Sequence, residues 1–264
     1  MPAAADDEPA AAYAALVAAA RTDPRVAGIV LSGSRGRAGV ATERSDHDVH
    51  LITHERLPAD DPIYRSIPGQ IDLIPWTLEA FRAFALAEEP EGWERYMEWR
   101  RYAFAHVTVE LDTLDGEIGR LVAAKGTLTP EVARRWAEEA LDGYVNFYYR
   151  SLKNDRDSRE TASHLDAAES ISHMLWALFA FFGRVRPYNK FLEWELREHP
   201  LPGGDWTAER LLPRIRSIVA TGDVDEQRRL YRDVERLAAD LGYGHVIAAW
   251  GDDLRLIRGE VDIG

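Results

Sequence analysis

The stretch from Gly33 to Asp48 constrains the fold of this 264-residue chain more than any other segment. It reads Gly-Ser-Arg-Gly-Arg, then a short spacer, then Ser-Asp-His-Asp. Apolar runs of the kind found in buried strands flank it, at 26–31 before and 49–52 after. Glycine permits a tight turn and a close backbone approach. The pattern therefore predicts a strand, a glycine turn and a second strand that opens with two alternating aspartates.

Three aspartates of the N-terminal half are candidate metal ligands. Asp46 and Asp48 lie two residues apart in the predicted strand 46–53, so their side chains share one face with Cα atoms about 6.6 Å apart. Asp72 follows in the apolar run 70–76, which predicts a third strand, and we expect it to be buried. A buried carboxylate is costly unless it is paired or metal-bound. We therefore expect all three carboxylates to gather around Mg²⁺, which prefers hard oxygen ligands.

The residues around the glycine turn are candidate phosphate ligands. The hydroxyl of Ser34 and the backbone amides after Gly33 can donate to phosphate oxygens, especially where residues 34–39 begin a short helix. Arg35 and Arg37 add positive charge and forked donors. Together with the aspartates, this set suits the binding of a nucleoside triphosphate with divalent metal.

The remaining pattern predicts an α+β fold: a small mixed-sheet domain with flanking helices, followed by an all-helical bundle. We expect a helix at 9–20, a helix from Thr77 to about 88 and a fourth strand at 103–111 in the first domain. After Asp115 the character is nearly all helical, with helices expected at 129–153, 158–182, 189–198, 206–220 and 223–241. We place the domains at 1–120 and 121–264, with a ligand cleft between them.

Composition narrows the classes of partner. A formal charge of −13 argues against a nucleic-acid groove and favours a small, preferably cationic substrate. The longest apolar run, 174–182, is too short to span a bilayer. The chain has no cysteine, which excludes disulfides, zinc–thiolate sites and a cysteine nucleophile. The acidic start lacks the basic region of a secretory signal, so we expect a cytoplasmic protein.

The order Gly-Ser, spacer, Asp-x-Asp and a later strand acid resembles the polymerase β-type nucleotidyltransferase superfamily. The motif Ser-Arg-x-Arg…Ser-Asp-x-Asp resembles that of antibiotic nucleotidyltransferases of the kanamycin and aminoglycoside type. The resemblance implies transfer of a nucleoside monophosphate, AMP from ATP in the first instance, to a hydroxyl of a small molecule. It also implies two Mg²⁺ ions on the aspartates, release of pyrophosphate, and the option of a homodimer.

The resemblance extends to the helical half. Asp142 falls where these enzymes carry a general-base glutamate, and it shares one helix face with Asn146, Tyr149 and Lys153. By this resemblance Asp142 accepts the proton of the acceptor hydroxyl, and Lys153 contacts the triphosphate. Lys190 follows a proline loop and is a further phosphate candidate. The alternatives are a solvated polar stripe on the helix and an exposed lysine in a helix-start turn.

Two other functions stay open. One is an antitoxin-like enzyme that adenylylates a partner protein, although the fused helical half counts against it. The other is a nucleotide-binding regulator without catalysis, although a sensor has no need of a full set of carboxylates. Two histidines near the aspartates are expected to be structural: His47 packs on the far face of its strand, and His50 is a hydrogen-bonded strand residue rather than a fourth ligand.

Overall fold

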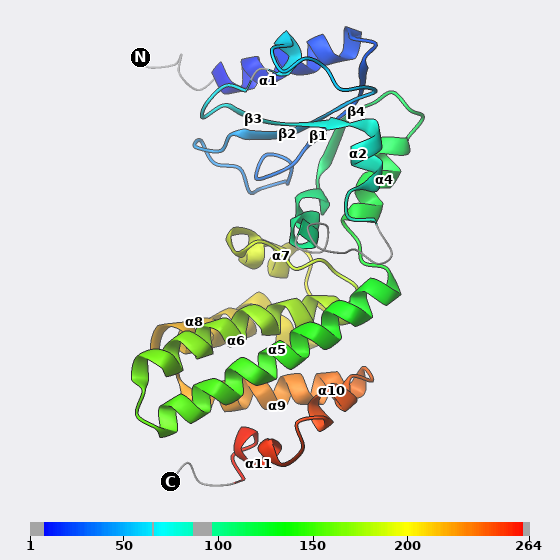
Figure 1. The fold of residues 1–264 in the computed structure, drawn as a ribbon. Coiled ribbons are helices and arrows are strands. Elements are labelled where there is room, and N and C mark those ends of the chain that lie inside the picture. The colour runs from blue at the N-terminus through cyan, green and yellow to red at the C-terminus, as the bar shows by residue number, and fades with distance from the viewer. Residues whose placement is uncertain (1–7, 65, 87–96, 261–264) are drawn as a thin grey trace, which may run out of the picture. The chain divides into compact units, whose positions relative to one another are not determined.

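The computed structural model describes residues 8–64, 66–86 and 97–260. The chain forms two compact units, 1–127 and 128–264, which are described separately. The first holds a four-stranded sheet with flanking helices, and the second is helical (Figure 1). The predicted α+β fold with a helical second half is therefore confirmed.

The sheet of the first unit is mixed, with strand order β3-β2-β1-β4. Strand β1 (Val26–Leu31) pairs antiparallel with β2 (His47–Thr53) and with β4 (Thr108–Asp112). Strand β2 pairs parallel with β3 (Ile71–Thr77). Three of the strands therefore form where the apolar runs predict them. They bring the glycine turn to the ends of β1 and β2.

The fourth strand begins later than predicted. Residues Glu98–Phe104 form a 3₁₀ helix, η2, and only Thr108–Asp112 are extended. Tyr102 and Phe104 are buried from this helix. The expectation of a strand from 103 was wrong because these aromatic residues reach the core from a helical turn rather than by alternating along a strand.

Helices cover both faces of the sheet. Helix α1 (Glu8–Thr22) packs on the face that carries Ile29, Val49 and Leu51. Helices α2 (Leu78–Ala83) and α4 (Glu117–Lys125), with η2, pack on the other face. These helices share a core with a second set of strand residues: Ala27, Val30 and Ile52.

Helix α2 begins where it was predicted but ends earlier, and α4 crosses the predicted domain boundary. Thr77 caps α2 as predicted, its hydroxyl accepting from the backbone N–H of Ala80 at 3.2 Å. The helix ends at Ala83, earlier than predicted, and the last residues of that expectation lie outside the described part of the chain. The domain boundary placed at 120/121 falls inside α4. This helix belongs to the first unit because Ile118 and Val122 complete its core.

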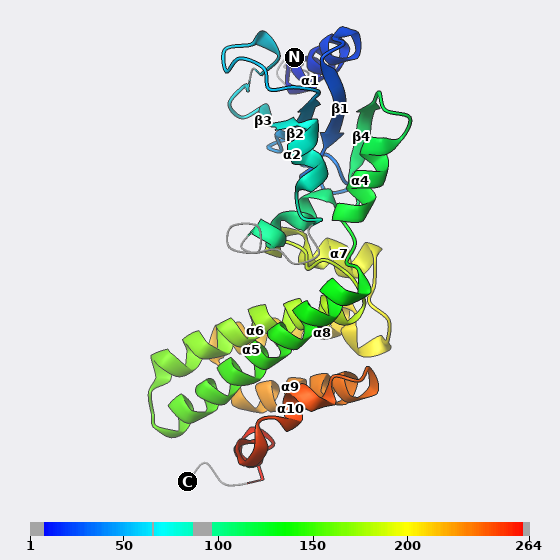
Figure 2. The same cartoon turned by 45° about the vertical axis from the view of Figure 1, so that its right-hand side comes forward.

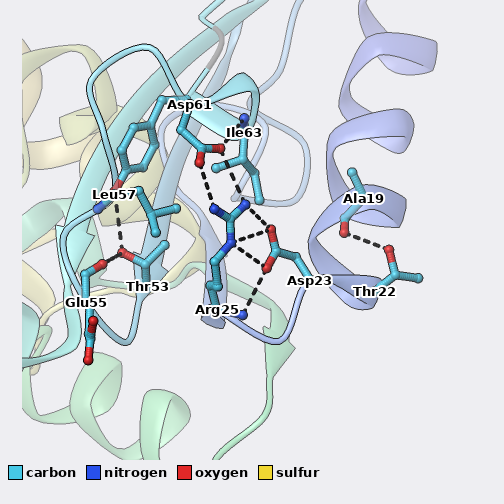
Figure 3. Close-up of polar contacts among 10 residues, drawn as sticks. Ala19, Thr22, Asp23, Arg25, Thr53, Glu55, Leu57, Asp61 and Ile63 are labelled. Carbon is cyan, nitrogen blue, oxygen red and sulfur yellow. Dashed lines mark hydrogen bonds and ion pairs between the residues drawn. The ribbon is translucent and has the colours of Figure 1, made fainter.

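An arginine between two aspartates fixes the entry to β1 (Figure 3). The guanidinium of Arg25 donates to Asp23 (Nη2 to Oδ2, 2.6 Å) and to Asp61 (Nη1 to Oδ2, 2.7 Å). Asp61 immediately precedes the one-turn helix η1 (Pro62–Tyr64), which lies between β2 and β3. The cluster therefore ties the start of β1 to the connection that leads into β3.

The second unit is built on a long hairpin of helices. Thr129 caps α5 (Pro130–Arg156) by accepting from the N–H of Val132, as predicted. Helix α5 and α6 (Glu160–Phe181) lie side by side in both views (Figures 1 and 2). The shorter elements are η3 (Asn189–Phe191), α7 (Leu192–Glu198), η4 (Gly204–Trp206), α8 (Ala208–Thr221), α9 (Val224–Asp240), α10 (Gly244–Ala248), η5 (Gly251–Asp253) and α11 (Leu254–Ile257). In the described residues, no helix is long and apolar enough to cross a membrane.

Candidate functional site

The glycine turn follows β1 directly. The N–H of Ser32 donates to the Asp48 carbonyl at 2.8 Å, which joins the turn to β2. Residues 33–40 form turns and a bend, not the short helix expected from residue 34. The Gly36 amide donates back to Ser32. Within the described residues, nothing accepts from the amides of Gly33, Ser34 and Arg35 or from the Ser34 hydroxyl. Successive unused N–H groups of this kind suit an anion.

Gly33 lies directly against the Asp48 carboxylate. A Cβ atom at position 33 would sit 1.7 Å from Oδ2 of Asp48, far inside van der Waals contact. Its φ of +60° also lies in the left-handed region, which residues with a Cβ rarely adopt. Both constraints require glycine here. The turn can therefore approach the carboxylate more closely than any other residue would allow.

Asp48 and Asp72 are direct neighbours in the sheet. They are register partners on the parallel strands β2 and β3, so they share a face with Cα atoms about 4.8 Å apart. Asp46 directly precedes β2. Asp46 and Asp48 are partly exposed and Asp72 is exposed. The expected burial of Asp72 was wrong, because β3 is an edge strand and the helices on this face pack farther along, around Ile52.

The three aspartates fit a metal only in part. Over the described ranges, no three His, Cys, Asp or Glu side chains are gathered closely enough to hold one ion. Mg²⁺, however, is commonly held by one or two carboxylates together with substrate phosphates and water. Asp48 and Asp72 meet that smaller requirement as neighbours in register beside the unused turn amides. The hard-oxygen chemistry of the set also suits Mg²⁺.

A chain of hydrogen bonds inside the sheet domain leads from Trp76 to the backbone of Asp48. The indole N–H of Trp76 donates to Nδ1 of His50 at 3.0 Å, and His50 Nε2 lies 3.1 Å from the Ser32 hydroxyl. Because indole can only donate, Nδ1 is the acceptor and Nε2 carries the proton. The Ser32 hydroxyl then donates to the Asp48 carbonyl at 3.2 Å.

This series of hydrogen bonds requires the neutral form of His50. Burial, with a smaller effect from the charge of Arg100, lowers the pKa of His50 to about 4. The prediction that His50 is a hydrogen-bonded strand residue is confirmed. His47 likewise packs on the α1 face as predicted, stacked on Tyr13 with ring centroids 4.4 Å apart.

The two arginines of the turn have different surroundings. Arg35 is partly exposed, and its Nε donates to the Ser45 carbonyl at 2.7 Å. Neither terminal nitrogen of Arg35 has a partner in the part of the chain that the structure describes. Arg37 is 3% exposed and donates to three backbone carbonyls, those of Gly33, Tyr102 and Ala105. Its position supports an anchoring role for the turn rather than the predicted contact with phosphate.

The candidates of the helical unit lie along one face of α5. Asp142 is exposed and accepts from the indole N–H of Trp250 at 3.0 Å. The Tyr149 hydroxyl donates to Asp253 at 2.8 Å, and its ring lies edge-on to Trp250. The Lys153 ammonium lies 4.9 Å from the centre of the Tyr149 ring. The shared face of these α5 residues is therefore confirmed, and the C-terminal segment lies along it.

Two residues that contact the α5 candidates were not predicted, and one predicted residue, Lys190, does not contact them. Trp250 and Asp253 were not predicted as site residues, because only the fold brings them to α5. Lys190 lies in η3, where its ammonium is 4.7 Å from the ring centre of Phe191. It is exposed, and no contact described for it reaches the Asp142 face.

Compared with protein-family models and with curated proteins, the sequence has no significant match.

Proposed function

We propose that the chain is a nucleotidyltransferase that transfers a nucleoside monophosphate, AMP from ATP in the first instance, to a hydroxyl of a small molecule. The observation that carries the proposal is the contact between Gly33 and the Asp48 carboxylate, with Asp72 in register on the next strand. A backbone held this close to a carboxylate, with unused amides beside it, suits a phosphate group that shares a metal with that carboxylate.

Each residue has a distinct role in the proposal. The amides of residues 33–35, the Ser34 hydroxyl and Arg35 hold the triphosphate, and Arg37 anchors the turn. Asp48 and Asp72, with Asp46, hold Mg²⁺, which when bound neutralises phosphate charge and orients the reacting oxygens. The acceptor oxygen forms a bond to the α-phosphorus, the bond from that phosphorus to the bridging oxygen breaks, and pyrophosphate leaves.

The helical unit enters the proposal through the resemblance alone. Asp142 is the proposed acceptor for the hydroxyl proton, and Lys153 and Lys190 are proposed phosphate contacts. The negative charge of the chain, −13, favours a cationic acceptor of the aminoglycoside type. A homodimer belongs to the same resemblance.

The test is pyrophosphate release by the full chain with Mg²⁺. Each of the four nucleoside triphosphates is paired with a panel of aminoglycosides and lincosamides. We expect Asp48→Asn to lower turnover by on the order of 100-fold or more, because it weakens a metal ligand. The matched control is Asp60→Asn, an exposed aspartate of the same unit, which should retain activity.

Three results would contradict the proposal. Turnover that survives both Asp46→Asn and Asp48→Asn would remove the metal assignment. Tight binding of a magnesium nucleotide without turnover on any acceptor would favour a regulator. A mass increase of one nucleotide on a co-purified protein would instead indicate a protein-modifying enzyme.

A further inference from the structure

Arg186, in the connection between α6 and η3, is a partly buried arginine that lacks an acidic partner among the described residues. Its Nη2 donates to the side-chain oxygen of Asn189 at 2.8 Å. Its guanidinium carbon lies 5.5 Å from the ring centre of Trp176. Its Nε is buried and has no acceptor, and no described residue accepts from Nη1. The group therefore keeps unused donors.

This arrangement is costly for the protein alone. Taking a cation out of water is unfavourable unless a counter-charge compensates it. Burial lowers the pKa of Arg186 to about 10, and no carboxylate opposes that shift. The chain is not short of acids, since it has 45 of them. In the part of the chain that the structure describes, the lack of a carboxylate beside Arg186 is therefore not explained by composition.

Two other partly buried arginines of the same unit, Arg184 and Arg214, are closely paired with carboxylates. Arg184, two residues earlier, is paired with Glu195. Arg214 lies 2.5 Å from Glu226 and 2.8 Å from Asp233. Over the described ranges, these two arginines have carboxylate partners and Arg186 has none. A site that must receive an anion from solution would have this property.

Aromatic side chains gather beside Arg186. Trp136 of α5 meets Trp176 edge-on, with ring centroids 5.0 Å apart. His173, one turn before Trp176, stacks on Phe147 with centroids 5.0 Å apart. Burial lowers the pKa of His173; the exposed Glu169 opposes this shift, and the charge of Arg186 adds to it more weakly. Glu169 forms no ion pair with Arg186 in the described structure.

A glycine of α5 permits this packing. A Cβ atom at Gly143 would lie 2.4 Å from Nδ1 of His173. Glycine within a helix is less favourable than alanine. The helix therefore accepts a local loss of stability that lets His173 pack closely against α5, on the same α6 face as Trp176.

We propose that Arg186 is the centre of a binding site for a phosphate-bearing anion, with the ring of Trp176 as one wall. A guanidinium presents forked donors that match phosphate oxygens. An aromatic wall beside it suits a ligand that carries a planar base as well as phosphate. The site stands whether or not the first unit transfers nucleotides. The anion has two sources, a nucleotide or a free phosphate compound.

The experiment uses the full chain labelled with ¹⁵N and titrated in the presence of EDTA, so that no metal takes part. The signal is the indole N–H of Trp176, assigned by its loss in Trp176→Phe. We expect pyrophosphate or ATP to shift this signal in a saturable way. A response to pyrophosphate shows that the phosphate group suffices, and a response to ATP alone shows that the nucleotide is required. Either response supports the site.

Variants test the role of the arginine. Arg186→Gln should abolish the shift, whereas the matched Arg197→Gln should retain it, because Arg197 is exposed and paired with Glu193. Arg186→Lys keeps the charge but loses the fork, and should weaken the apparent affinity by on the order of 10-fold. An unchanged shift in Arg186→Gln would overturn the proposal. An equal response to succinate would overturn its specificity for phosphate.

Thermal stability separates binding from a structural role. Because Arg186 is uncompensated, Arg186→Gln should keep the melting temperature of the ligand-free chain or raise it, while losing the increase that pyrophosphate gives the wild type. A large loss of melting temperature without ligand, together with an intact response to pyrophosphate, would assign Arg186 to structure alone. Neither readout depends on turnover, so failure of the proposed reaction would leave them interpretable.

Discussion

Acidification should destabilise the α/β unit through one buried histidine, His50. Its side chain is 3% exposed and sits between the Trp76 indole and the Ser32 hydroxyl. Protonation at Nδ1 would put two N–H donors face to face. The fold therefore binds the neutral form, and burial lowers the pKa from 6.5 to about 4.

The sign and size follow from linkage. Between pH 6.5 and pH 4 the unfolded chain carries the proton on His50 and the folded chain does not, so the free energy of unfolding falls as the pH falls. A difference of 2.5 pKa units corresponds to about 3 kcal/mol in total. Of this, about 2 kcal/mol should be lost between pH 7.5 and pH 5.

The assay is guanidinium denaturation at pH 7.5 and pH 5, with His50→Gln as the reference. Glutamine also offers an acceptor and a donor, but it does not titrate. His47 and His173 are present in both proteins, so their effects cancel in the difference. The wild type should lose about 2 kcal/mol more than the variant. Parallel pH dependences in the two proteins would refute the neutral, doubly bonded histidine.

Three further substitutions test other parts of the first unit. Gly33→Ala should cost about 1–2 kcal/mol from its positive φ alone and should displace the Asp48 carboxylate; an unchanged denaturation midpoint would contradict this. Arg37→Met should cost about 3 kcal/mol, because it removes a buried donor from three carbonyls, and the same assay measures it. Lys125 is buried, its ammonium donates to the Phe84 carbonyl, and burial with the charge of Arg101 lowers its pKa to about 8. The wild type should therefore gain stability relative to Lys125→Met as the pH rises from 8 to 10, and a constant difference would count against the lowered pKa.

The sequence predicts the elements best where the apolar pattern is continuous. Strand β1, Val-Ala-Gly-Ile-Val-Leu, forms at the expected bounds because its run of small and apolar residues favours a buried strand. Strand β3, Ile-Asp-Leu-Ile-Pro-Trp-Thr, forms within one residue of them although Asp72 interrupts its apolar run. The prediction of the fourth strand was wrong over its first half, where the pattern is not continuously apolar. Aromatic residues separated by charged ones, as in 98–104, suit a helical turn as well as a strand, and only tertiary packing decides between them.

The candidate site likewise contains residues that local sequence predicts and residues that only the tertiary fold places. Local spacing was enough to place Asp46, Asp48 and His50 at the start of one strand. The anchoring of Arg37 could not be foreseen, because its acceptors at Tyr102 and Ala105 are more than sixty residues away in the chain. The exposure of Asp72 depends on the position of β3 at the sheet edge, and strand order is not written in local sequence.

The parallel register of β2 and β3 has a consequence for how such a chain can diverge. A shift of β3 by one residue would bring Ile71 or Leu73 opposite Asp48 and turn Asp72 to the α1 face. The connection between the two strands can therefore vary in length only while its exit point stays fixed. The ion pair between Arg25 and Asp61, midway along that connection, fixes the point from which its second half runs to β3. Insertions between residues 54 and 60 should consequently be tolerated, whereas a single-residue deletion between 66 and 71 should separate the two carboxylates while leaving the strands themselves able to form.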